Sequence, residues 1–507
     1  MRVRMIGVVV GLTLVAAVAC TSSDPVTTSA PTTQAQQQQS TSDTKKPTGT
    51  VPVSDGEKPT ESKKNKTAKP YADTIDISIQ DIQDWWSETM PEVYDGKAYK
   101  DIAPSKLYPA TEKKAAPSCS PDGGKGTYKE VHNNAFYCSL GGFVAWDDQD
   151  LMPRLYKTYG EFAVAMVFAH EWGHAIQDQT KVLGTVPTIV TENQADCFAG
   201  AWTKHALQDK SAGFRATAND LQSALAGMLE FRDQPGTSIN DQSAHGSGFD
   251  RVNGFQTGFD EGAAKCATFI KDQPKFLNLK FGSQADVDSG GNMAYEQATE
   301  AASLDLNAYW ENIAKKYKVD FTPVDSVEKF SSATAMPKCG SKQYTEDEAL
   351  GTIFFCVDDN KVAWDEDMLQ DVSKSIGDFG LAVLLAKQWA ASFQLQGGQS
   401  KDQITSKLGS TQQSCFTGAW TRAVLDGDKH DLTSSGEPSL TLSPGDLDEA
   451  IQAFLAFSDS PDEKGTTASG SAFENVKAFR DGFLATNGEV LCDSYGSSDG
   501  GGSTDTK

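Results

Sequence analysis

Basic residues are few for a chain of this length. The 507 residues include 45 Lys and Arg against 69 Asp and Glu, which gives a formal net charge of −24. Binding to the phosphate backbone of a nucleic acid depends on clustered Lys and Arg side chains. The charge balance therefore argues against a nucleic-acid-binding protein and favours solubility.

Long hydrophobic runs are also scarce. Hydrophobic residues make up 38% of the chain, which is low for a fully globular protein, so we expect part of the length to be tail or linker. Residues 6–18 form an extended apolar run, but it is too short to span a membrane as a mature helix. The remaining length is sufficient for two or three domains with hydrophobic cores.

The N-terminal residues have the features of an export signal. Arg2 and Arg4 precede the apolar run, which ends in the sequence Ala-Val-Ala-Cys. Small residues before a cysteine resemble a bacterial lipobox, in which Cys20 is lipidated and becomes the mature N-terminus, although Ala17 stands where Leu is usual. An ordinary secretory signal cleaved after Ala19 is the alternative. Both interpretations place the mature chain outside the cytoplasm, and the lipobox would anchor it to the cell membrane.

Two segments contain almost no large apolar residues. Residues 21–71 consist mainly of Thr, Ser, Gln, Pro and Lys, and residues 494–507 are rich in Gly, Ser and Asp. Such segments cannot bury enough surface to offset the entropy that is lost on ordering. We therefore predict a lipoprotein signal peptide at 1–20, a disordered tether at 21–71 and a disordered tail at 494–507.

Three segments of the sequence occur twice, in the same order and at nearly constant spacing. One such match could arise by chance, but three in order indicate two copies of one domain. We place the first copy at residues 72–300 and the second at 301–493. The matching pairs are NNAFYCSLGGFVAW at 133–146 with GTIFFCVDDNKVAW at 351–364, DCFAGAW at 196–202 with SCFTGAW at 414–420, and FDRVNGFQTGF at 249–259 with FENVKAFRDGF at 473–483.

Eight cysteines remain once Cys20 is assigned to lipidation. An even count in an exported protein indicates a disulfide framework, with free buried thiols as the alternative. Both copies hold four cysteines at matching places, so we expect the pairing to occur within each copy. The first pair of each copy would close a short loop, and the second would join distant segments. The predicted disulfides are Cys119–Cys138, Cys197–Cys266, Cys339–Cys356 and Cys415–Cys492.

The apolar pattern predicts a predominantly helical α+β fold. Residues 159–179 and 192–207 are long apolar segments that are typical of buried helices. Residues 134–146 favour two strands joined by a Leu-Gly-Gly turn. Further helices are expected at 75–90, 223–233 and 249–271.

The sequence His-Glu-Trp-Gly-His begins at residue 170. His170 and His174 are four residues apart and share one helix face, so both imidazoles can reach one metal ion. Glu171 then lies where it can accept a proton from metal-bound water. The alternative is two ordinary histidines on a helix.

A catalytic zinc ion needs a third protein ligand and one open position. Glu192 begins the next predicted helix, and Asp196 follows one turn later on the same face. This spacing allows Glu192 to bind the ion while Asp196 accepts a hydrogen bond from a ligand imidazole. Acidic residues are also common in the solvated first turn of a helix, which is the alternative.

The second copy lacks all of these residues. Residues 387–391 read Lys-Gln-Trp-Ala-Ala, and Ser410 and Ser414 stand in place of Glu192 and Asp196. The residues that the proposed site needs have changed together, whereas the neighbouring Cys, Gly and Trp residues are retained. We therefore assign Glu192 and Asp196 to the same site as the histidines, and we predict that the second copy is a degenerate, pseudoenzyme domain.

His245 is a further candidate. It lies opposite Ser469 of the second copy, just before one of the matching segments. A histidine near zinc can stabilise the oxyanion of a tetrahedral intermediate. A surface-loop histidine is the alternative, and the sequence leaves both open.

HEWGHAIQ at 170–177 together with ENQADCFAGAW at 192–202 is similar to the bacterial neutral zinc metallopeptidase family. The resemblance covers residues 119–270 and implies a zincin-like domain with a gluzincin-like zinc site. It does not extend to the second copy, and it supplies no substrate. The zinc ligands that it implies are His170, His174 and Glu192, with Glu171 as the catalytic base.

From these features we predict a membrane-anchored, extracytoplasmic zinc metallopeptidase with two tandem zincin-like domains. Its substrate would be a peptide or protein, docked along an edge strand of the hairpin at 134–146. The second domain would bind substrate or a protein partner, or cover the cleft. The alternatives are a cell-envelope scaffold with a structural or vestigial zinc ion, and hydrolysis of a non-peptide amide. An intact Glu171 favours the enzyme, because a structural zinc site does not need that base.

Overall fold

A computed structural model of the chain describes residues 3–4, 70–208, 211, 213–214, 217–427, 440–457 and 472–495. Cys20, the predicted tether up to residue 69, and the predicted tail after residue 495 lie outside these residues, as does the predicted signal peptide except for Val3 and Arg4.

The described chain forms two compact units, which divide between Asn278 and Leu279. We call them the N-terminal unit and the C-terminal unit, and we describe each by itself. The sequence places the division after residue 300, which falls inside a helix at Tyr295–Tyr317. That whole helix belongs to the C-terminal unit.

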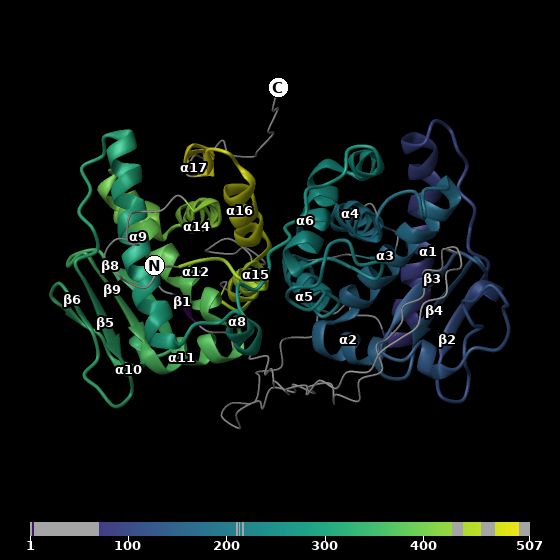
Figure 1. The fold of residues 1–507 in the computed structure, drawn as a ribbon, viewed down its shortest axis with the longest axis horizontal. Helices are drawn as coiled ribbons and strands as arrows, with labels where there is room; N and C mark the ends of the chain where they lie inside the picture. Colours follow the sequence, from purple (N-terminus) through teal and green to yellow (C-terminus); the bar gives the residue numbers. More distant parts are fainter. Residues whose placement is uncertain are drawn as a thin grey trace. The chain divides into compact units, whose positions relative to one another are not determined.

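The N-terminal unit is mostly helical and contains a small sheet (Figure 1). This arrangement agrees with the α+β class. Its elements are α1 (Tyr71–Val93), η1 (Pro104–Lys106), β2 (Leu107–Ala110), η2 (Tyr128–Glu130), β3 (Ala135–Cys138), β4 (Phe143–Asp147), α2 (Leu151–Tyr159), α3 (Glu161–Thr180), α4 (Thr188–Leu207), α5 (Ala218–Leu229), α6 (Gly248–Glu261), α7 (Ala263–Ala267) and η3 (Thr268–Ile270).

The sheet of the N-terminal unit has the order β2-β4-β3. Strands β3 and β4 pair in antiparallel fashion with Tyr137 opposite Val144, so they form the predicted hairpin. Strand β2 pairs with β4 in parallel. Strand β3 therefore lies at an edge of the sheet, with one row of backbone groups directed away from β4.

Helix α3 runs through the core of the N-terminal unit and packs against α1, α2, α4, α5 and β3. Its sequence is apolar or small on all sides, which is typical of a buried helix. Gly173 permits the close contact with α4, because a Cβ atom at this position would lie 2.8 Å from the Cα atom of Ala195. This close packing brings the two helices that carry the candidate site together.

Two predicted helices are interrupted at glycines. The helix predicted over 159–179 is α3 except for Tyr159, which is the last residue of α2, and Gly160 separates the two helices at a φ of 88°. The helix predicted over 249–271 divides at Gly262, where φ is 83°. Both glycines adopt a backbone conformation that other residues rarely accept, and such residues end helices.

The C-terminal unit has a similar order of helices and strands, with several additional short elements. Its helices and strands are α8 (Gln284–Ser289), α9 (Tyr295–Tyr317), β5 (Ser326–Phe330), β6 (Lys338–Cys339), β7 (Lys342–Gln343), α10 (Glu346–Ala349), β8 (Thr352–Cys356), β9 (Lys361–Asp365), α11 (Glu366–Ser375), α12 (Asp378–Gln396), α13 (Lys401–Thr405), α14 (Lys407–Asp426), α15 (Asp446–Ala456), α16 (Ala472–Leu484) and α17 (Gly488–Tyr495).

Strand pairing in the C-terminal unit also matches that of the N-terminal unit. Strand β5 runs parallel to β9, and β8 runs antiparallel to β9 with Phe355 opposite Val362. A two-residue strand, β1 (Val3–Arg4), pairs with the other edge of β8. It lies within the segment predicted as a signal peptide.

Four disulfides link the described residues, and they are the pairs expected from the cysteine spacing. Cys119 bonds to Cys138 at the hairpin, and Cys197 of α4 bonds to Cys266 of α7. Cys339 bonds to Cys356, and Cys415 bonds to Cys492.

None of the helices in the described parts of the chain combines the length and the apolar character that a membrane crossing requires.

Candidate metal centre

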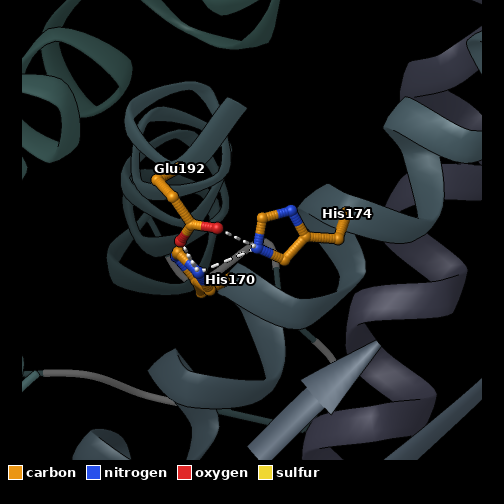
Figure 2. A group of neighbouring side chains, drawn as sticks. All are labelled: His170, His174 and Glu192. Carbon is orange, nitrogen blue, oxygen red and sulfur yellow. Dashed lines mark hydrogen bonds and ion pairs between the residues drawn. The ribbon is translucent and has the colours of Figure 1, made fainter. Parts of the chain in front are cut away.

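Three side chains from two neighbouring helices converge in the N-terminal unit (Figure 2). His170 and His174 lie one turn apart on α3, and Glu192 lies in the first turns of α4. All three are largely buried, with exposed side-chain fractions of 11%, 15% and 11%. The two helices that the sequence predicts as buried therefore bring the three predicted ligands to one point.

The distances among the three side chains fit a tetrahedral zinc ion. The two Nε2 atoms are 3.2 Å apart. The Glu192 carboxylate lies 3.3 Å from His170 Nε2 and 3.4 Å from His174 Nε2. Zinc bonds of about 2.0–2.1 Å at a tetrahedral angle place neighbouring ligand atoms about 3.3–3.4 Å apart.

The other ring nitrogens indicate the same arrangement. Nδ1 of His170 lies 2.7 Å from Asp196 Oδ1, and Nδ1 of His174 lies 2.9 Å from the side-chain oxygen of Gln177. Both partners are acceptors, so Nδ1 of each ring carries a proton, and Nε2 faces the other two side chains. When both rings are neutral, their Nε2 lone pairs and the Glu192 carboxylate can bind one cation.

The hydrogen bond to His170 is itself held in place. Arg251 on α6 donates from Nε to Asp196 Oδ2 at 2.9 Å and from Nη2 to Oδ1 at 2.8 Å. Its third nitrogen donates to the carbonyl of Phe231. A bidentate Arg–carboxylate pair is geometrically specific, so it fixes the orientation of Asp196 and, through it, the His170 ring.

Gln177 has the corresponding role for His174. Its amide nitrogen donates to the Thr191 carbonyl at 2.6 Å and to the side-chain oxygen of Gln194 at 3.1 Å. These two bonds fix the orientation of the amide, so its oxygen faces His174. Neither Gln177 nor Arg251 is predicted from the sequence. Gln177 lies three residues after His174 on the same helix face, and this spacing could have indicated its contact with the histidine. No local sequence pattern indicates the contact between Arg251 and Asp196.

The electrostatics of the site favour positive charge. Burial lowers the pKa of His170, but the carboxylates of Asp196 and Glu192 outweigh burial and raise the pKa to about 10. Burial raises the pKa of Glu192, yet the imidazoles of His174 and His170 hold the pKa well below its usual value. The same carboxylate charges that stabilise a proton on an imidazole stabilise a metal cation between these residues.

Glu171 lies beside this cluster but is not one of its three converging groups. One of its carboxylate oxygens accepts the backbone N–H of Tyr137 on the free edge of β3, at 2.8 Å. Burial raises the pKa of Glu171, while the charges of His170 and His174 act in the opposite direction, and the net shift is upward. A carboxyl group with a raised pKa beside a metal site suits proton transfer near neutral pH.

His245 lies on the loop before α6 and does not join the three converging residues. Its Nδ1 is 3.4 Å from Asp233 Oδ1, and its side chain is 33% exposed. Burial lowers the pKa of His245, but Asp233 and Glu192 raise it overall. His245 is thus close enough to Glu192 to interact electrostatically, and its suggested role in stabilising an oxyanion remains a prediction.

The corresponding place in the C-terminal unit holds different chemistry. Lys387 of α12 is buried, and its ammonium group lies 3.3 Å from the Ser410 hydroxyl of α14. Gln388 accepts the backbone N–H of Phe355 on β8, as Glu171 does from Tyr137. Ser414 donates to Asn475 of α16. A lysine and a serine stand here, where the N-terminal unit has an imidazole and a carboxylate.

Comparisons with known proteins identify the region that carries the site. Residues 123–269 match the model of a protein family described as "Putative neutral zinc metallopeptidase". The chain is 33% identical over 163 residues to Uncharacterized protein YpfJ of Escherichia coli K12, covering 27% of this chain and 54% of that protein. It is 30% identical over 159 residues to Uncharacterized protein Rv2575 of Mycobacterium tuberculosis, covering 26% of this chain and 54% of that protein.

The chain thus spans about half the length of these two curated relatives. No solved structure matches the chain. The family description names zinc and peptidase activity, and the matched residues include all three converging side chains together with Glu171.

Proposed function

We propose that this chain is a zinc-dependent peptidase that acts outside the cytoplasm. The observation that carries the proposal is the convergence of His170, His174 and Glu192, at the spacing of tetrahedral zinc ligands, with Glu171 next to them. The family match over 123–269 supports the same reaction class.

A zinc ion held by these three residues would supply a Lewis acid that polarises the scissile carbonyl and lowers the pKa of the attacking water. Glu171 takes a proton from that water and delivers it to the leaving amine. The Tyr137 N–H, which donates to Glu171, holds the carboxylate in position for both transfers. Asp196 and Gln177 keep the two imidazoles oriented.

The free edge of β3 provides a surface for an extended peptide. Because β3 pairs with β4 on one side only, its other side can accept the backbone of a substrate as an additional strand. This edge faces Glu171 through Tyr137. A peptide bound there in an extended conformation would therefore present its backbone to the catalytic base.

We also propose that the two units arose by duplication and that the C-terminal unit is a degenerate copy. The order of elements, the strand register and the second disulfide of each unit correspond. The functional positions differ, since Lys387 and Ser410 stand where His170 and Glu192 stand. The C-terminal unit would then bind substrate or a partner without hydrolysing it.

The location of the protein follows from the N-terminal sequence. We propose that Cys20 carries a lipid that anchors the mature chain to the cell membrane, with the folded units outside the cytoplasm. The four disulfides are consistent with an oxidising compartment.

The main rival is a binding or scaffold protein with structural zinc. Structural zinc sites are closed by four protein ligands, whereas His170, His174 and Glu192 provide three. Glu171 is also buried beside the site without being one of these ligands. Burying a carboxylate costs free energy, and a purely structural site has no need of such a group.

Hydrolysis of a non-peptide amide is a second rival, and it would use the same residues. A screen of peptide and non-peptide amide substrates separates the two activities.

Glu171→Gln tests the proposal directly. The substitution retains the side-chain volume and an oxygen for the Tyr137 N–H, but it removes the base. We expect cleavage of a peptide library to fall by at least roughly 10²–10⁴-fold, while zinc remains bound at the wild-type ratio. Gln388→Glu, at the corresponding place of the C-terminal unit, is the matched control and should leave cleavage unchanged. Wild-type cleavage by Glu171→Gln would rule out the proposed role.

A further inference from the structure

The C-terminal unit contains a second cluster of potential metal ligands, far in sequence from the first. Asp378 begins α12, and Asp446 and Glu449 lie in the first turn of α15. One carboxylate oxygen from each residue lies within 4.8 Å of those of the other two. All three residues are buried, with exposed fractions of 7%, 3% and 7%.

Backbone hydrogen bonds hold each carboxylate in place. Glu449 accepts the N–H of Phe379 at 3.0 Å, which caps the start of α12, whose N-cap residue is a glycine. Asp446 accepts the N–H of Ser443 at 2.7 Å. Oδ2 of Asp378 accepts the N–H of Met293 at 2.9 Å. These bonds explain the orientation of the carboxylates, but they supply no positive charge to the cluster.

One oxygen in the cluster has no partner. Oδ1 of Asp378 is buried and receives no hydrogen bond from the described residues. A buried carboxylate oxygen without a donor is costly, and most buried polar atoms in proteins are satisfied. Acidic residues in the first turn of a helix are common, but they are usually solvated. The unpartnered oxygen therefore indicates a ligand that the side chains themselves do not supply.

Within the described ranges, none of the three carboxylates forms an ion pair with Lys, Arg or His. Burial, followed by the charges of neighbouring carboxylates, raises the pKa of Glu449 to about 8 and raises the pKa of Asp446 well above its usual value. Burial also raises the pKa of Asp378. Buried charges in proteins are usually paired with an opposite charge or coordinate a metal ion.

The described residues at the corresponding place of the N-terminal unit do not form such an acidic cluster. LQSALAGMLEF at 221–231 corresponds to LDEAIQAFLAF at 447–457, so Ser223 stands in place of Glu449. Among the described residues of that unit, neither Ser223 nor Asp220 belongs to a group with metal-ligand spacing. The acidic cluster is therefore a property of the unit that lacks the zinc ligands.

We propose that Asp378, Asp446 and Glu449 form a binding site for one calcium ion. Oxygen ligands at 2.3–2.6 Å allow opposite ligand atoms to be about 4.6–5.2 Å apart, which accommodates the observed separations. Calcium accepts carboxylates in flexible geometry and completes six to eight positions with backbone oxygens or water. Zinc favours nitrogen and sulfur ligands, which this cluster does not offer. The ion joins the start of α12 to the start of α15, and it neutralises the charge that they share.

The test uses the mature full-length chain, loaded with zinc and freed of other metals. Calcium chloride is titrated by calorimetry, and thermal unfolding is followed with and without calcium. We expect one calcium ion per chain, with a dissociation constant of about 10⁻⁴ M or tighter and a rise in the unfolding temperature of the C-terminal unit. Magnesium chloride at the same concentration should produce a smaller rise.

Asp446→Asn and Glu449→Gln provide the discriminating variants. Each removes one repelling charge, so the calcium-free variants should unfold at a higher temperature than the calcium-free wild type. Calcium should then cause little or no further rise, and its affinity should fall by at least 10-fold. Asp367→Asn, at an exposed position of α11, is the charge-matched control and should respond as the wild type does.

Glu449→Gln and Glu192→Ala serve different purposes in this test. Glu449→Gln keeps an oxygen for the Phe379 N–H, and it supplies the answer if Asp446→Asn does not fold. Glu192→Ala, which lacks a zinc ligand, should keep full calcium binding, and this separates the two sites. Absence of calcium binding to the wild type at millimolar concentration, or unchanged binding to both acidic variants, would overturn the proposal.

Discussion

At the residue scale, the candidate zinc site depends on side chains that never touch the ion. Asp196 and Gln177 accept hydrogen bonds from the outer nitrogens of the two imidazoles, and Arg251 fixes Asp196. Such outer partners determine which tautomer the histidines adopt and how basic they are.

Asp196→Asn should weaken zinc binding without abolishing it. The amide keeps the shape of the side chain but loses the charge that stabilises His170, and it leaves Arg251 without its ion-pair partner. We expect the zinc dissociation constant to rise by roughly 10–100-fold, measured by competition with a chelator of known affinity. Asp241→Asn, on an exposed loop, should leave the constant unchanged. Equal affinity of Asp196→Asn and the wild type would show that the hydrogen bond to His170 has no part in binding.

The sequence predicted some of these residues and missed others. His170, Glu171 and His174 follow a spacing that a single helix face explains. Glu192 and Asp196 required the comparison of the two copies, since acidic residues near a helix start are otherwise common. Arg251 was missed because its partner, Asp196, lies 55 residues away, and no local pattern encodes that contact.

At the element scale, the site is produced by the packing of α3 against α4. Both helices were predicted, and α4 begins at Thr188, four residues before its predicted start. The helix predicted over 249–271 is instead divided at a glycine, where the apolar pattern continues. Gly160 separates α2 from α3, and Gly262 separates α6 from α7. The spacing of apolar residues predicts which helix face is buried. It does not predict where a glycine adopts a positive φ and ends the helix.

The Cys197–Cys266 disulfide should support the zinc site through α4. Replacing both cysteines by Ala should destabilise the N-terminal unit by about 2–5 kcal/mol and lower its zinc affinity, because α4 carries Glu192 and Asp196. The Cys415–Cys492 pair is the matched control, since its removal should destabilise the C-terminal unit by a similar amount without changing zinc affinity. Differential scanning calorimetry and zinc titration measure the two effects. Loss of zinc affinity in the control alone would contradict the assignment of zinc to the N-terminal unit.

At the scale of the whole molecule, the two units have a similar order of helices and strands but different groups of potential metal ligands. The N-terminal unit places two imidazoles and a carboxylate at the junction of α3 and α4. The C-terminal unit places Lys387 at the corresponding junction, and its three buried carboxylates lie elsewhere, at the starts of α12 and α15. We infer that one unit carries out the chemistry and that the other, stabilised by calcium, serves binding.

The sequence predicts two units, but it places the boundary between them after residue 300. The repeated segments define the two copies, but residues 279–300 have no repeated motif to assign them, and packing places them with the C-terminal unit. The acidic cluster was also missed, because Asp378 and Glu449 are 71 residues apart in the sequence and meet only after α12 and α15 pack together.

The zinc content of the purified mature chain tests the central claim most directly. Elemental analysis of the wild type and of Glu192→Ala, after dialysis against excess zinc and then against metal-free buffer, should find one zinc ion per wild-type chain and close to none in the variant. Two zinc ions per wild-type chain would contradict the degenerate C-terminal unit. Full zinc retention by Glu192→Ala would show that the carboxylate of α4 does not bind the ion, and it would contradict the account of the site.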